Sequence, residues 1–127
     1  MKVKINTKEK FHAITVSESA ISATMTEELY VCLLPNLQND VKNVVLILKD
    51  IETIDDAAAK AIVNIQQKFY DSKASFVLCE LQKPVMEFLR NSGWSDSVNI
   101  APTESEAADI VQMEELEREF QREDENL

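Results

Sequence analysis

The sequence predicts an α/β domain with a single mixed β-sheet of four to five strands and about four packed helices. The apolar runs NVVLIL (43–48) and ASFVLCEL (74–81) are typical of strands that are buried on both faces. The segment between them has the periodicity of an amphipathic helix, and its links to both runs are short. Short links of this kind favour right-handed parallel crossovers, and 127 residues suit one domain.

The first third of the chain predicts two strands and a helix. KVKINT (2–7) and HAITVS (12–17) alternate polar and apolar residues, as short strands do. The next segment predicts a helix that is capped by Thr24 or Thr26 and carries Pro35 near its end. The buried strand NVVLIL follows this helix.

The middle of the chain predicts two more helices. Segment 55–73 has an apolar stripe at spacings of four, three and four, formed by Ala58, Ile62, Ile65 and Phe69. Residues 83–93 predict a short helix with Pro84 in its first turn and Gly93 in the left-handed position past its end. SVNIAP (97–102) predicts a last short strand.

The C-terminal segment is strongly acidic. Residues 103–121 predict a helix that Thr103 and Glu106 open as a capping box, and QREDENL (121–127) is expected to fray. From Glu104 onward ten acids and two arginines give a charge of −8, whereas the preceding residues carry only −2. We therefore divide the chain into a domain over 1–113 and an acidic helical tail over 114–127.

Two interpretations remain open for this last helix. It packs on the sheet at 107–113 and is solvated beyond, or its apolar stripe is a docking or dimer surface formed by Ile110, Met113, Leu116 and Phe120. Under the first interpretation, truncation after Glu114 should leave the unfolding transition nearly unchanged, because a charge-dense tail repels itself.

Composition argues against several classes of function. The acidic tail argues against nucleic acid and anionic membranes as partners. No run approaches the roughly 18 apolar residues of a membrane helix and no signal peptide is visible, so we expect a cytoplasmic protein without membrane insertion. The chain has one glycine, Gly93, whereas the common phosphate-binding loops use several. It has one histidine, His12, so catalytic triads and the common metal sites lack most of the residues that they need. We expect no catalytic residue, cofactor or metal, His12 at a solvent edge, and Cys32 and Cys79 as small buried hydrophobes.

The order of elements and two stretches resemble the STAS domain, the family of bacterial anti-sigma factor antagonists and of sulfate transporter tails. NVVLILKDIETIDDAAAKAIV resembles the family pattern V-V-L-D-L-S-x-V-x-x-I-D-S-S-G-L-x-x-L. FLRNSGWSDSVNIAPTESEA resembles the family ending L-x-x-x-G-L-x-x-x-x-x-I-x-x-T-x-x-E-A, on which fall Gly93, Ile100, Thr103, Glu106 and Ala107. SAISAT (19–24) resembles the G-x-L-D-x-x stretch, with Ser19 and Ser22 in place of Gly and Asp. The likeness extends to about residue 112.

The resemblance implies a phosphorylation switch whose acceptor is missing. In the family a partner kinase, which is also the anti-sigma factor, phosphorylates the second serine of D-S-S-G. Asp55 matches the family Asp, Asp56 the first serine, Ala57 the phosphorylated serine and Ala58 the glycine. Two interpretations of the acids remain open. Asp55 caps the following helix while Asp56 adds a favourable charge, or Asp56 supplies a permanent charge that mimics the phosphorylated state.

The resemblance also implies a non-enzymatic regulatory protein that binds another protein, such as an anti-sigma factor kinase or a larger regulatory assembly. The expected partner face comprises Ser22, Thr24, Asp55, Asp56, Ala57, Ala58 and Lys60. A homodimer is left open. The first alternative is a STAS subunit of a membrane transport system that docks on an ATPase or permease. The second is a small-ligand binder at the same helix start, where two acids would repel anions.

Overall fold

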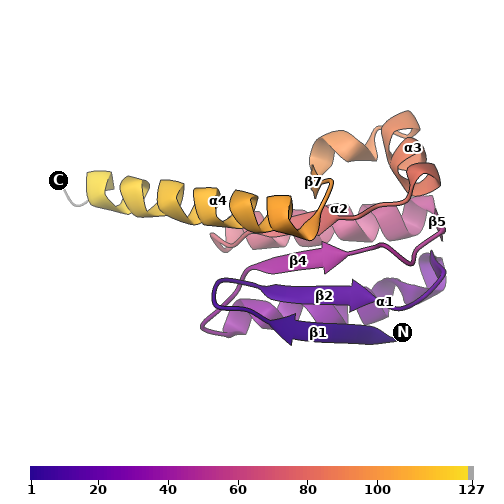
Figure 1. Cartoon of the computed structure of the whole chain (residues 1–127), viewed down its shortest axis with the longest axis horizontal. Coiled ribbons are helices and arrows are strands. Elements are labelled where there is room, and N and C mark those ends of the chain that lie inside the picture. Colours follow the sequence, from indigo (N-terminus) through magenta and orange to yellow (C-terminus); the bar gives the residue numbers. More distant parts are fainter. Residues whose placement is uncertain (126–127) are drawn as a thin grey trace.

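The computed structural model describes the backbone of residues 1–125 and the side chains of residues 1–121. It confirms the predicted α/β class: a five-stranded sheet has the order β1-β2-β4-β6-β7 and carries four α-helices (Figure 1). Its strands are β1 (Val3–Thr7), β2 (His12–Val16), β4 (Val44–Ile47), β6 (Phe76–Cys79) and β7 (Asn99–Ala101). Its helices are α1 (Thr26–Leu33), α2 (Asp56–Asp71), α3 (Lys83–Asn91) and α4 (Glu104–Glu125). β1 is antiparallel to β2 and every other pairing in this sheet is parallel, as the short crossover links predicted.

The helices cover the two faces of the sheet unequally. One core joins alternate residues of β2, β4 and β6 to α1, α2 and α3, with Ile14, Leu46 and Phe76 among its fully buried members. The opposite face carries a smaller core, in which Ala107 and Val111 of α4 pack on residues such as Val45 and Val77. In Figure 1, α4 crosses in front of the sheet and extends beyond it. Within residues 1–125, no helix has both the length and the apolar character that crossing a bilayer requires.

Several short elements were not predicted. β3 (Ala20–Ile21) and β5 (Thr53–Ile54) form a separate two-stranded parallel sheet. Short 3-10 helices follow as η1 (Ala23–Met25), η2 (Leu34–Gln38) and η3 (Trp94–Ser97). Segments of two to five residues are too short to show a periodicity, so sequence patterns do not reveal them.

The helix ends test the predicted capping residues. Asp55 caps α2, Thr103 accepts a hydrogen bond from the Glu106 amide at 3.1 Å, and Gly93 has a positive φ of 83°, all as predicted. The predicted cap of α1 is wrong. Residue Met25 holds that position without a side-chain bond, because η1 runs directly into α1 and leaves Thr26 inside the helix.

His12 and Cys32 depart from their predicted environments. His12 is buried rather than at a solvent edge, with Nδ1 3.0 Å from Thr7 Oγ1 and Nε2 2.8 Å from the Val41 carbonyl oxygen. A carbonyl only accepts, so Nε2 carries the proton and the ring is tied into the fold. Cys79 is buried as predicted and burial raises its thiol pKa to about 12, whereas Cys32 is only half-buried. Both thiols are free.

The end of α4 also differs from the prediction. We expected the chain from Gln121 to fray, but the helix continues to Glu125. Glutamate, arginine and glutamine are good helix formers, and propagating an existing helix costs little. The remainder of the predicted frayed segment, 126–127, lies outside the described residues.

Candidate functional site

The start of α2 is held against η1 by the small two-stranded sheet. Ile21 pairs with Ile54, so the residues that follow each strand leave the sheet side by side. Ser22 and Asp55 are those residues. Sequence reasoning placed both in one partner face, and the β3–β5 pairing provides the contact that brings them together.

Asp55 bonds to both segments. Its Oδ1 accepts the Ala58 backbone N–H at 2.9 Å, which satisfies one free donor of the α2 start. Its Oδ2 accepts the Ala23 backbone N–H at 2.9 Å, across 32 positions of sequence. The interpretation of Asp55 as a cap is therefore confirmed, and the same side chain also fixes η1 on α2.

Asp56 has a partner that the sequence did not reveal. The indole Nε1 of Trp94 donates to its Oδ1 at 3.1 Å, from η3, which follows α3 in the chain. Asp56 lies in the first turn of α2, where its charge is favourable to the helix dipole. A hydrogen bond from a tryptophan 38 positions away leaves no local pattern, and only the fold brings the two side chains together.

The predicted partner face is mostly accessible. Thr24, Asp56, Ala57 and Lys60 are exposed, and Ser22 and Asp55 are half-buried, with Ser22 Oγ 3.0 Å from Thr24 Oγ1. Ala58 differs, because its side chain is fully buried in the main core. The Ala58 side chain therefore offers no surface to a partner in this structure, and Ala57 is the small exposed residue of this helix start.

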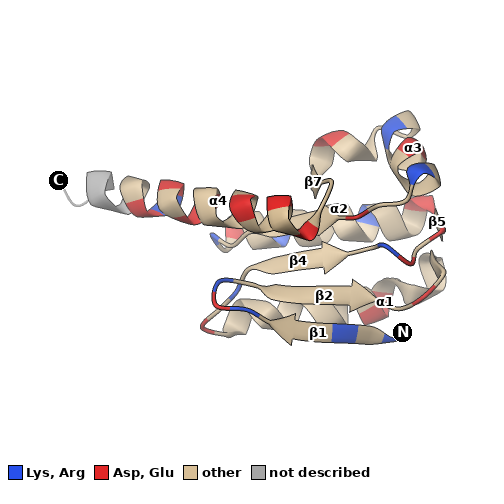
Figure 2. Cartoon of the chain, in the orientation of Figure 1, with Lys and Arg blue, Asp and Glu red and all other residues tan. Residues whose placement is uncertain are grey.

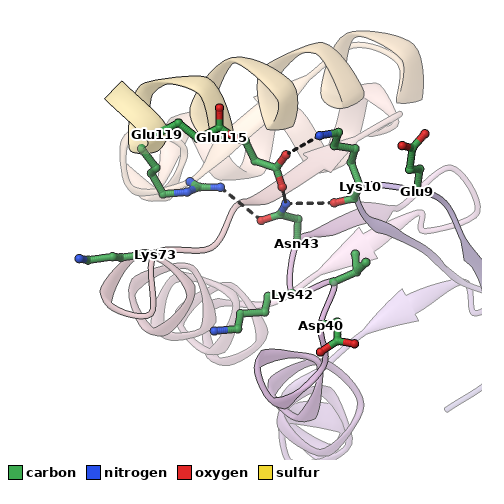
Figure 3. Close-up of a pocket in the computed structure, with 10 residues that line it drawn as sticks. Glu9, Lys10, Asp40, Lys42, Asn43, Lys73, Glu115 and Glu119 are labelled. Carbon is green, nitrogen blue, oxygen red and sulfur yellow. Dashed lines mark hydrogen bonds and ion pairs between the residues drawn. The ribbon is translucent and has the colours of Figure 1, made fainter. Parts of the chain in front are cut away.

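A second polar cluster was not predicted. It lies where the parallel strands β2, β4 and β6 begin. Buried Asn43, just before β4, donates to the Lys10 carbonyl at 3.0 Å and to Glu115 Oε1 at 2.7 Å. Its Oδ1 accepts the Ser75 backbone N–H at 2.7 Å, and Arg118 donates to Ser75 Oγ at 3.2 Å. Lys10 completes the cluster with an ion pair to Glu115 at 3.4 Å (Figure 3). The cluster therefore anchors α4 beyond residue 113.

A polar cavity of about 410 Å³ opens beside this cluster. Its charged lining comprises the acids Glu9, Asp40, Glu115 and Glu119 and the bases Lys10, Lys42, Lys73 and Arg118 (Figure 3). The numbers of acids and bases are equal, so the lining favours neither an anion nor a cation. In residues 1–121, no group of three or more His, Cys, Asp or Glu side chains is placed to hold a metal ion.

These contacts change the expected result of truncating the tail. Ending the chain after Glu114 removes both Glu115 and Arg118, so the buried Asn43 side chain loses two hydrogen-bond partners, Glu115 at 2.7 Å and Arg118 at 3.5 Å. We now expect that truncation to lower the free energy of unfolding by about 2 kcal/mol. Truncation after Gln121 keeps the cluster and should change it by less than about 0.5 kcal/mol. Urea unfolding of both proteins measures the difference, and equal stabilities would show that the domain ends near residue 113.

This chain is similar to one protein family and to several solved structures. A family model described as the STAS domain matches residues 3–107. An anti-sigma factor antagonist from Mycobacterium paratuberculosis is similar with a TM-score of 0.75 and 14% identity, over 87% of this chain and 93% of that chain. A variant of RsbS from Moorella thermoacetica is similar with a TM-score of 0.73 and 18% identity, over 93% of this chain and 99% of that chain.

A transporter contains the same fold. The chain is similar to part of the murine solute carrier 26 family member A9 anion transporter, with a TM-score of 0.65 and 10% identity, over 82% of this chain and 18% of that chain. At these identities the likenesses to solved structures show the fold alone. No curated protein matches the sequence significantly.

Proposed function

Because this chain belongs to the STAS domain family, we propose that it is a non-enzymatic regulatory protein that binds another protein through η1 and the start of α2. It acts in the manner of an anti-sigma factor antagonist that lacks the phosphorylatable serine. The partner is a protein of the anti-sigma factor kinase type or a regulatory assembly that contains one.

The exposed surface around Ala57 carries this proposal. Asp55 fixes η1 to α2 by two hydrogen bonds of 2.9 Å, so the surface is preorganised before a partner arrives. Ala57 has no hydroxyl, so the position that matches the family's phosphorylated serine cannot be modified. Phosphorylation at this position therefore cannot regulate the interaction.

The Trp94 bond favours the structural interpretation of Asp56 over phosphate mimicry. One carboxylate oxygen is already engaged at 3.1 Å by the indole N–H, so less of the charge is free to act on a partner. Asp56 also lies one residue before the position that matches the family's phosphorylated serine. We propose that its main role is to stabilise the α2 start and to hold η3 beside it.

Replacing Ala57 by glutamate tests the proposed face. The partner is first recovered with the tagged full chain from cells of the source organism, identified by mass spectrometry and purified. Ala57→Glu should weaken its binding by at least about tenfold, because a larger charged side chain then stands beside Asp56. Thermal stability should not fall, because position 57 is exposed and an acid in the first turn favours the helix dipole.

A charge-matched control separates a local effect from net charge. Gln38→Glu adds the same charge at an exposed position of η2 and should leave the affinity unchanged. If Ala57→Glu and Gln38→Glu bind the purified partner as tightly as the wild type, the helix start is not the interface.

The alternative is a subunit of a membrane transport system that docks on an ATPase or permease. It is favoured by one observation, the similarity to a segment of an anion transporter chain. The same recovery experiment distinguishes the two, because the recovered partner is then a transport component instead of a kinase-type regulator.

A further inference from the structure

Helix α4 has a face that is fixed to the body of the protein. Ala107 and Val111 are fully buried against the sheet. Glu115 and Arg118 continue the same face and bond to Asn43 and Ser75. Four contacts spread over three turns hold the helix in one orientation, so its other faces are presented in fixed directions.

The opposite face of α4 is apolar and uncovered. Met113 is 60% exposed, Leu116 is 47% exposed and Phe120 is 65% exposed. At about 100° per residue, the three side chains point away from the side of Val111 and Arg118. We call these three residues the α4 stripe. Their spacing of i, i+3 and i+7 is the spacing by which a helix inserts anchor residues into a groove of another protein.

Acidic side chains border the α4 stripe. Asp109, Glu117 and Glu119 are exposed on the same helix, and Figure 2 shows acidic residues along much of α4. In a heptad with Met113 and Phe120 at the a positions, Glu117 and Glu119 take the e and g positions, where charge sets the choice of partner. A second α4 would bring acids against acids at these positions. Charge complementarity therefore favours a basic partner over another copy of this chain.

We propose that the α4 stripe binds a basic amphipathic helix of another protein, whose apolar side chains are flanked by lysine or arginine. This surface is separate from the one around Ala57. In Figure 1, α4 extends away from the end of the molecule where β5 lies, so the two surfaces leave room for separate partners. The protein then acts as an adaptor between them.

A designed peptide tests the chemistry of this surface. The probe is a fluorescent peptide of about three heptads with leucine at a and d and lysine at e and g. It should bind the full chain saturably at low salt, and added salt should weaken the binding. A matched peptide with glutamate at e and g should bind at least about tenfold more weakly, because its charges repel the acids beside the stripe.

Variants of the chain locate the site. Leu116→Gln combined with Phe120→Gln should weaken binding of the lysine peptide by at least about tenfold, with the helical content unchanged because both side chains are exposed. Val31→Gln removes an apolar side chain of similar exposure on α1 and should have no effect.

Three results would overturn the proposal. One is a lack of saturable binding of the lysine peptide to the wild type. Another is equal binding by the double variant. The third is a wild-type dimer, measured by light scattering, that the double variant converts to a monomer, since the α4 stripe would then be an interface between copies of this chain.

Discussion

Replacing Asn43 by alanine is expected to lower the free energy of unfolding by about 3 kcal/mol and the melting temperature by about 10 °C. Asn43 is 4% exposed and joins three segments. Without it, the Ser75 backbone N–H and the Lys10 carbonyl lose hydrogen bonds, and Glu115 loses its amide partner. Leaving several polar groups unpaired at once costs more than a single hydrogen bond contributes. Urea unfolding monitored by circular dichroism measures the change.

Two further variants show whether the cluster is the cause. Asn91→Ala changes an exposed asparagine near the end of α3 and should cost less than about 0.5 kcal/mol. Asn43→Asp places a carboxylate beside Glu115 and should also destabilise the protein. Adding Glu115→Gln should then restore part of the loss, because an amide can donate to the new carboxylate. If Asn43→Ala costs no more than Asn91→Ala, the cluster does not contribute to stability.

Replacing Asp55 by alanine is expected to cost about 2 kcal/mol and to loosen η1 from α2. The variant loses the cap of α2 and the bond to the Ala23 N–H together. The amides of Ala23 and Ala58 should exchange with solvent faster, relative to global unfolding, than in the wild type. Hydrogen exchange followed by NMR measures both amides in one experiment.

Asp55→Asn separates the two roles of this side chain. Asparagine keeps one carboxamide oxygen and remains a good cap, but it cannot accept two N–H groups from opposite sides as well as a carboxylate does. Its cost should therefore be intermediate, with the Ala23 amide more affected than the Ala58 amide. Asp50→Ala, in an exposed turn, serves as the control. Unchanged exchange of the Ala23 amide in Asp55→Ala would contradict the linking role of this residue.

The main elements of this fold follow from local patterns in the chain. The runs around Val45 and Val77 are buried strands because nothing polar interrupts them, and the stripe from Ala58 to Phe69 forms the buried side of α2. Capping by Asp55 is equally local, since the donor lies three residues away. The family, and with it the expected partner face, also followed from residue patterns.

The tertiary structure alone decided the interactions between distant residues. The bond from Trp94 to Asp56 spans 38 positions, and the bond from Asn43 to Glu115 spans 72. The burial of His12, and the anchoring of α4 past residue 113, likewise depend on which segments the sheet brings together. Periodicity records which side of an element is apolar, because burying that side stabilises the fold. A single polar side chain that bonds to a residue far along the chain leaves no repeat in the sequence, so only the folded structure reveals the bond.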